Sequence, residues 1–68
     1  MFENRLAFAE HLRKVYGTAL LSKVRAAKEL SISRATLDRM RQQGEIKSQK
    51  IGHQIRFNVK EIARVVMS

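Results

Sequence analysis

Residues 22–57 read SKVRAAKELSISRATLDRMRQQGEIKSQKIGHQIRF, with SRATLDRMR at positions 33–41 in the centre. In this central segment Leu37 and Met40 are three residues apart and share one face of a helix, while arginines surround them. Basic side chains gathered on one side of a helix form a typical electrostatic footprint for nucleic acid. The segment therefore predicts a short basic helix that is presented to a nucleic acid.

A second helix is expected directly before this one. Ser22 can cap a helix over residues 23–30, and Ser33 can cap the basic helix over residues 34–43. Gly44 then stands where a left-handed C-cap is expected. Two helices joined by so short a turn form the helix-turn-helix arrangement. The apolar face of the first helix is expected to hold Val24, Ala27 and Leu30.

Residues 46–57 predict a β-hairpin. Ile55 and Phe57 alternate with polar residues, which is the pattern of a half-buried strand. Gly52 and His53 suit a two-residue type II′ turn, because that turn requires glycine at its first position. The hairpin would follow the basic helix directly and offer a second contact point beside it.

Two further segments complete the central unit. Asn58 can cap a closing helix over residues 58–67, and Glu61 at the third helical position can reach back to it in a capping-box arrangement. Before the helix pair, residues 18–21 are expected to form an extended connector.

Apolar residues at three- and four-residue steps predict an amphipathic helix over residues 2–16, with Gly17 as its C-cap. This helix either completes a core too small to stand alone or serves as a surface for self-association or a partner. We favour the first interpretation, because small domains usually need every apolar face they have. The expected stripe consists of Phe2, Leu6, Ala9, Leu12, Val15 and Tyr16, with Phe8 widening it.

The charge of the chain favours a polyanionic partner. Fourteen lysines and arginines against six acids give a formal charge of +8, and eleven of the fourteen bases lie in residues 23–68. A field of this size attracts polyanions over a Debye length of about 8 Å. Nucleic acid is the partner that fits this charge.

Other function classes find little support. The chain has no cysteine, and His11 and His53 lack metal-ligand spacing, so no metal or other cofactor is expected. No apolar run approaches the roughly 18 residues of a membrane span, and no signal-peptide pattern is present. We therefore expect a cytoplasmic, nucleoid-associated protein without membrane or small-molecule partners. The serines and acids form no catalytic arrangement, so no enzyme activity is expected.

The candidate DNA-binding residues form two groups. N-terminal side chains of a helix in the major groove reach base edges, and the free amides beside Ser33 suit a phosphate. Hairpin side chains can follow the adjacent groove or backbone. A solvated basic surface is the alternative for both groups. Asp38 is expected to orient Arg34 or Arg41 through an ion pair. The candidates are Ser33, Arg34, Thr36, Arg39 and Arg41 in the helix, and Lys47, Lys50, His53, Gln54 and Arg56 in the hairpin.

The segments AAKELSISRATLDRMRQQGEI at 26–46 and KIGHQIRFNVKEI at 50–62 resemble the excisionase and MerR-like winged helix-turn-helix domains. The resemblance covers about residues 20–66. It implies a mainly α-helical fold with a small β-hairpin as the wing, and double-stranded DNA as the partner. Two departures stand out: Ser31 replaces a glycine that is frequent in the family, and the N-terminal helix lies outside the pattern.

Stand-alone family members about as long as this chain are similar to recombination directionality factors of prophages and mobile elements. Those factors bind adjacent sites, bend DNA and help an integrase excise the element. The resemblance thus implies an integrase and neighbouring copies of the chain as further partners. One alternative is a small transcriptional regulator of a mobile element, and another is a protein-interaction module that uses the N-terminal helix. The expected organisation is one domain, 1–68, made of an accessory helix at 1–17, the helix-turn-helix at 22–44, the wing at 46–57 and the closing helix at 58–67.

Overall fold

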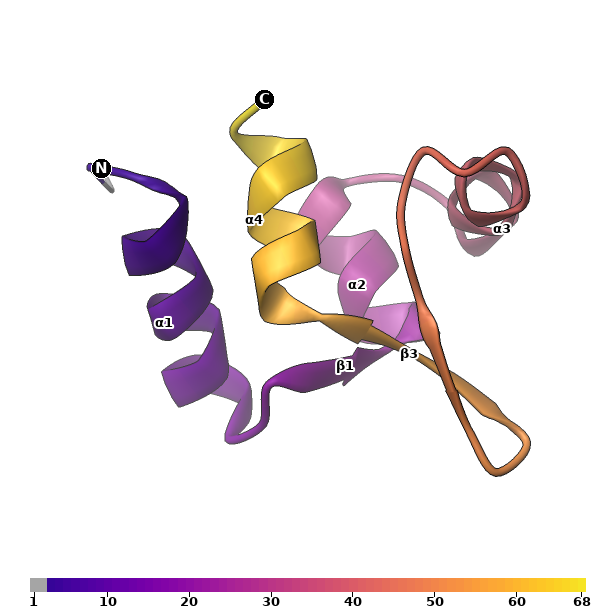
Figure 1. The fold of residues 1–68 in the computed structure, drawn as a ribbon, viewed down its shortest axis with the longest axis horizontal. Helices are drawn as coiled ribbons and strands as arrows, with labels where there is room; N and C mark the ends of the chain where they lie inside the picture. Colours follow the sequence, from indigo (N-terminus) through magenta and orange to yellow (C-terminus); the bar gives the residue numbers. More distant parts are fainter. Residues whose placement is uncertain (1–2) are drawn as a thin grey trace.

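The computed structural model describes residues 3–68, which form four helices and a three-stranded antiparallel sheet whose hairpin projects from the helices (Figure 1). The sheet has the strand order β1-β3-β2, so that β3 is central. The elements in chain order are α1 (Arg5–Tyr16), β1 (Leu20–Ser22), α2 (Lys23–Leu30), α3 (Arg34–Gln42), β2 (Gln49–Ile51), β3 (Gln54–Asn58) and α4 (Val59–Val66).

The helix pair α2–α3 is capped as the sequence predicts. The Ser22 hydroxyl accepts from the Arg25 amide at 3.3 Å, and the Ser33 hydroxyl accepts from the Thr36 amide at 3.1 Å. Between the helices, Ser31 has φ 57°, the left-handed conformation that glycine adopts without steric cost. The serine at the family's frequent glycine position therefore keeps the turn that glycine would make.

The wing, residues 46–57, contains the predicted hairpin of β2 and β3. Lys50 pairs with Ile55, and Ile51 pairs with Gln54 directly beside the turn. Gly52 has φ 63°, and His53 has a negative φ, as a type II′ turn requires.

The expected connector at 18–21 contributes a strand as well. Leu21 of β1 pairs with Phe57 of β3, and the Val59 amide donates to the Ala19 carbonyl at 2.8 Å. This pairing turns the hairpin into a three-stranded sheet, which the short connector sequence alone did not indicate.

The core draws one large side chain from almost every segment of the chain. Small residues of α2, Ala26 and Ala27, are buried beside them and let the neighbouring elements approach closely. The largest fully buried side chains are Leu12 of α1, Leu21 of β1, Leu37 of α3, Ile46 of the linker, Phe57 of β3 and Ile62 of α4. Because these residues interlock, the position of α3 is fixed by the rest of the molecule.

The N-terminal helix differs from its prediction in extent and in face. Asn4 caps it by accepting from the Ala7 amide at 2.9 Å, so it begins at Arg5 rather than at residue 2. Leu6 and Val15 are 68% and 59% exposed, although both were expected on the buried stripe. The buried positions are Ala9 and Leu12, with Phe8 and Tyr16 packed beside them; Phe2 lies outside the described residues.

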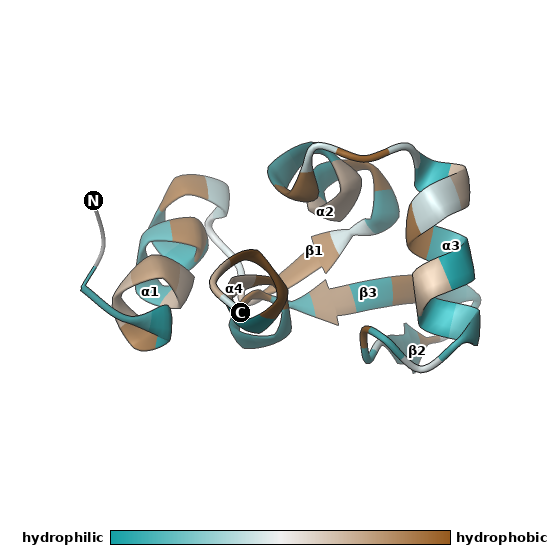
Figure 2. Ribbon diagram, turned by 90° about the horizontal axis from the view of Figure 1, so that it is seen from above, coloured by the Kyte–Doolittle hydropathy of each residue, from teal (hydrophilic) through white to brown (hydrophobic). Residues whose placement is uncertain are grey.

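The reason is that α1 packs mainly on α4 and touches α2 through Tyr16 at its end, so it buries only a narrow stripe. One predicted apolar position elsewhere fails similarly, because Val24 of α2 is 57% exposed. Figure 2 shows α4 lying between α1 and the rest of the domain.

The closing helix begins as predicted but does not form the expected capping box. The Asn58 side chain accepts from the Lys60 amide at 2.8 Å. Glu61, however, accepts from the Lys47 amide at 3.2 Å and pairs with Arg64 instead of reaching back to Asn58. With this local exception, the predicted fold class is confirmed: a mainly helical winged helix-turn-helix with a small hairpin, preceded by an N-terminal helix.

Candidate nucleic-acid interface

The helix α3 and the wing lie at the end of the molecule opposite α1. Both views place α1 on one side of α4 and α3 with the hairpin on the other (Figures 1 and 2). The molecule measures 31 Å along its longest axis. A ligand that contacts α3 and the hairpin therefore meets the end of the domain that is remote from α1.

The α3 helix has a buried face and an exposed basic face. Leu37 is fully buried and Met40 packs partly against the core, as predicted. The Arg34 and Arg39 side chains are exposed and make no hydrogen bond or ion pair with any residue from 3 to 68. Both guanidinium groups can therefore contact a ligand. The buried face of α3 holds the helix that carries them in one orientation.

The start of α3 forms a compact polar group. Ser33 donates its hydroxyl to the Thr36 hydroxyl at 3.0 Å while it accepts from the Thr36 amide at 3.1 Å. Only part of the first turn is satisfied in this way, since four amides at a helix N-terminus lack intrahelical partners. The exposed arginine Arg34 directly follows, so an anion at this point would meet both backbone dipoles and a full positive charge.

Asp38 forms ion pairs with Lys23 of α2 and with Arg41 of its own helix, and none with Arg34. Its carboxylate lies 2.9 Å from the Lys23 ammonium and 3.4 Å from the Arg41 guanidinium. The hydrogen bond from Lys23 lowers the pKa of Asp38, and Arg41 adds to the effect although partial burial opposes it. Of the two expected partners, the structure gives Arg41 and not Arg34, while Lys23 is a partner that sequence reasoning missed.

Arg41 consequently differs from the other two arginines of α3. Its side chain is about one-quarter exposed, at 28%, and turns to Asp38. Its Nε is buried without a hydrogen-bond partner among the described residues. The structure therefore separates Arg41 from the exposed pair Arg34 and Arg39, although the sequence grouped all three.

The hairpin presents basic side chains on both of its faces. Directly paired residues point to the same side of a sheet and successive residues alternate. Lys50 therefore shares a face with Ile55, and Arg56 shares the other face with Gln54. The Arg56 guanidinium donates to the Gln54 side chain. At the tip, His53 is exposed, so the predicted wing residues line two sides of the hairpin rather than one.

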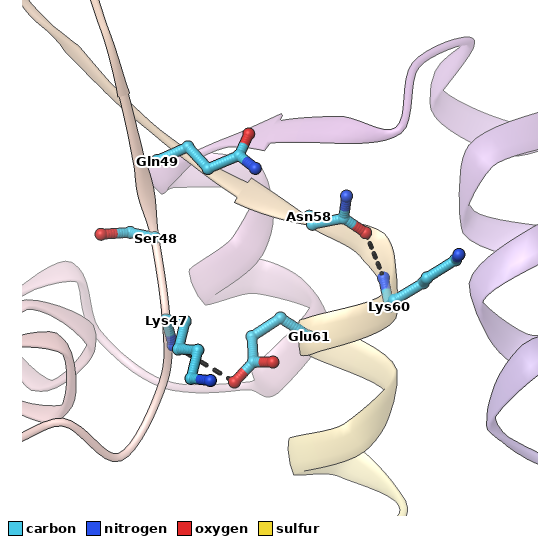
Figure 3. A pocket seen from close by; sticks show the side chains of 6 residues that line it. All are labelled: Lys47, Ser48, Gln49, Asn58, Lys60 and Glu61. Carbon is cyan, nitrogen blue, oxygen red and sulfur yellow. Dashed lines mark hydrogen bonds between the residues drawn. The ribbon is translucent and has the colours of Figure 1, made fainter.

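Lys47 stands apart from the other wing candidates. It lies where the linker from α3 passes α4, beside an open hollow of about 230 Å³ (Figure 3). Polar groups in this hollow are already engaged: Asn58 caps α4, and Glu61 binds the Lys47 amide. Because the Glu61 carboxylate is negatively charged, it disfavours the binding of an anion such as a phosphate in this hollow. The lining consists of Lys47, Ser48, Gln49, Asn58, Lys60 and Glu61.

Two further observations concern the described part of the chain as a whole. Residues 3–68 hold no group of three metal-binding side chains of the histidine, cysteine or carboxylate type. No helix within the same range is long and apolar enough to cross a membrane.

A comparison with protein families agrees with this architecture. A family model described as a helix-turn-helix domain matches residues 20–68, which includes β1, the helix pair, the wing and α4 but excludes α1. No curated protein and no solved structure matches the chain. The match thus begins at the strand that pairs with β3 and ends with the closing helix.

Proposed function

Because this chain belongs to the helix-turn-helix domain family, we propose that it binds double-stranded DNA sequence-specifically, with α3 in the major groove and the wing beside it. One observation carries the proposal. The Arg34 and Arg39 side chains of α3 are exposed without a partner among residues 3–68, while Leu37 of the same helix is fully buried. Arginine in this setting can hold guanine O6 and N7 through two hydrogen bonds or grip a phosphate.

The proposed roles follow the positions of the side chains. Arg34, Thr36 and Arg39 face the base edges, and the amides beside Ser33 receive a phosphate. Arg41, whose guanidinium is turned toward Asp38, contacts the DNA backbone. The remaining contacts to groove or backbone come from the wing, and they involve Lys47, Lys50, His53, Gln54 and Arg56.

The biological role that we propose is that of an excisionase, a factor that directs recombination toward excision of a prophage or mobile element. The resemblance to the excisionase and MerR-like domains supports this role, as does the high positive charge. The whole chain, residues 1–68, would act as one domain in the nucleoid, with an integrase and neighbouring copies as partners. Bending the site costs on the order of 1–6 kcal/mol, which adjacent protomers can share. We propose no catalytic step.

A gel-shift titration tests this function. The protein is titrated against attachment-site DNA from the element that encodes it and against an unrelated fragment, at two salt concentrations. Discrete, laddered complexes on the attachment site alone support an excisionase. Selective binding to the element's promoter, independent of an integrase, supports the transcriptional regulator instead. Equally weak binding to all fragments contradicts sequence-specific recognition and favours the protein-interaction alternative.

A further inference from the structure

The linker between α3 and β2 is held to the body of the domain at one point. Between Gln43 and Ser48, Ile46 is the only buried residue, at 1% exposure. Its two neighbours, Glu45 and Lys47, are exposed, yet the backbone of each is bonded to α4. The linker is therefore fastened on both sides of its one buried side chain.

Two side chains of α4 make these bonds. Glu61 accepts from the Lys47 amide at 3.2 Å, and the Arg64 guanidinium donates to the Glu45 carbonyl at 2.9 Å. The two side chains also bond each other, with the Arg64 Nε 3.0 Å from the Glu61 carboxylate. We call this pair the α4 clamp. Figure 3 shows the Glu61 carboxylate directed at the linker.

The linker that the α4 clamp holds connects the two parts of the proposed interface, α3 and the wing. Upstream of the linker, α3 packs mainly on α2. Downstream, β2 pairs only with β3, and all three of its residues are exposed. Few contacts join α3 directly to β2 or β3. The clamp and Ile46 therefore constrain how α3 and the wing are placed, in addition to the pairing of β3 with β1 and the burial of Phe57.

We propose that Glu61 and Arg64 are positioning residues that fix the wing relative to α3, so that both reach one stretch of DNA together. This inference rests on the proposed DNA binding and extends it to residues outside the interface. A fixed arrangement avoids the reduced affinity that arises when only a fraction of the molecules has the binding geometry. Neither residue needs to touch DNA for this role.

The chain offers a matched control, because Glu10 and Arg13 of α1 form an ion pair with the same spacing as Glu61 and Arg64. The experiment measures DNA affinity and its salt dependence for Glu61→Ala, Glu61→Gln and Glu10→Ala in the full chain. We expect Glu61→Ala to weaken binding about tenfold. The slope of log K against log salt should fall by about one for each phosphate that the wing no longer reaches. Glu10→Ala is expected to bind as the unchanged chain does.

Two readouts separate positioning from general stability. Glutamine keeps an acceptor for the Lys47 amide, so Glu61→Gln should restore most of the affinity. In a chain whose two hairpin strands lack their basic residues (Lys50→Ala with Arg56→Ala), Glu61→Ala should weaken binding little further. An equal effect of Glu61→Ala in both backgrounds, or an unchanged salt slope, would overturn the proposal.

A measurement without DNA keeps the clamp testable if binding fails. Hydrogen exchange of the Lys47 amide, followed by NMR, should accelerate in Glu61→Ala at a temperature where the chain is folded, but not in Glu10→Ala. Unchanged exchange would refute the clamp itself. If the unchanged chain binds no DNA but the Lys47 amide responds, the proposed function fails while the clamp stands.

Discussion

The carboxylate of Asp38 in α3 lies 2.9 Å from the ammonium of Lys23, the first residue of α2. The two residues are fifteen positions apart, so the ion pair links the start of one helix to the middle of the next. Arg41 joins the same carboxylate at 3.4 Å. The ion pair between Lys23 and Asp38 therefore holds α2 and α3 together at the surface, while the buried Leu37 holds α3 against the core.

Removing this carboxylate should loosen the helix pair. We expect Asp38→Asn to lower the melting temperature at neutral pH, because Lys23 and Arg41 lose their common partner. The pKa of Asp38 is lowered in the folded chain, so its stabilisation is present above the unfolded pKa of about 3.9 and is lost as pH falls through the folded value. Thermal melts from pH 7 to pH 2 check this.

The same melts contain their own control. Glu10 and Glu61 also have lowered pKa values, so the Asp38→Asn variant and the unchanged chain both lose stability in acid. The difference between Asp38→Asn and the unchanged chain should nevertheless shrink toward low pH. A difference that stays constant down to pH 2 would contradict the role of the Asp38 charge.

Arg39→Ala tests direct readout by α3. If the guanidinium reads a base, its removal should cost about 1–3 kcal/mol of binding free energy and relax the preference at one base pair. Arg5→Ala, at the remote end in α1, serves as the control and should have little effect. Competition binding with a set of singly substituted sites measures both quantities. A uniform weakening on every sequence would assign Arg39 to a phosphate.

Leu37→Ala should destabilise the domain strongly. Truncation of a fully buried leucine costs roughly 2–5 kcal/mol, whereas a domain of this size has a stability of roughly 3–10 kcal/mol. Leu6→Ala is the matched control, because Leu6 is 68% exposed and its truncation should cost no more than about 0.5 kcal/mol. Chemical denaturation followed by circular dichroism compares them. Similar costs would refute the assigned packing of the two leucines.

Ser31→Gly should stabilise the chain. Ser31 is the one non-glycine residue with positive φ in the described range, and that conformation costs about 1–2 kcal/mol for an L-residue. Glycine removes the cost but gives back about 0.5–1 kcal/mol through its freedom in the unfolded state, so a net gain of about 0.5 kcal/mol is expected. Ser31→Ala retains the Cβ and should show no gain. Denaturation midpoints decide between the two outcomes.

The sequence predicted those features that depend on neighbouring residues. Ser22, Ser33 and Asn58 cap the helices they precede, because an N-cap bond spans two or three residues and can be read locally. Gly52 occupies the turn position expected of it for the same reason.

Features that depend on distant parts of the chain escaped prediction. Glu61 had the right spacing for a capping box, but the Lys47 amide and Arg64 reach its carboxylate in the folded chain. The ion pair between Lys23 and Asp38 forms only once α2 and α3 cross. The exposure of Leu6 follows from the packing of α1 mainly against α4, and periodicity cannot specify how wide the buried stripe will be.

The candidate site shows the same division. Sequence patterns marked Leu37 and Met40 as the buried pair of α3, with Arg34, Arg39 and Arg41 around them. The separation of Arg41 from Arg34 and Arg39, and the position of Lys47 against α4, depend on partners from other elements. Which of these residues contact DNA stays a prediction.

The pairing of β1 with β3 has an evolutionary consequence. It brings Leu20 opposite Asn58, so the segment that contains the helix pair and the wing starts and finishes at neighbouring points of the sheet. Whatever precedes Leu20 is joined to this segment at its closed base, far from α3. A different N-terminal segment can be attached at this point without passing near α3, provided that it covers the face of α4 on which α1 packs.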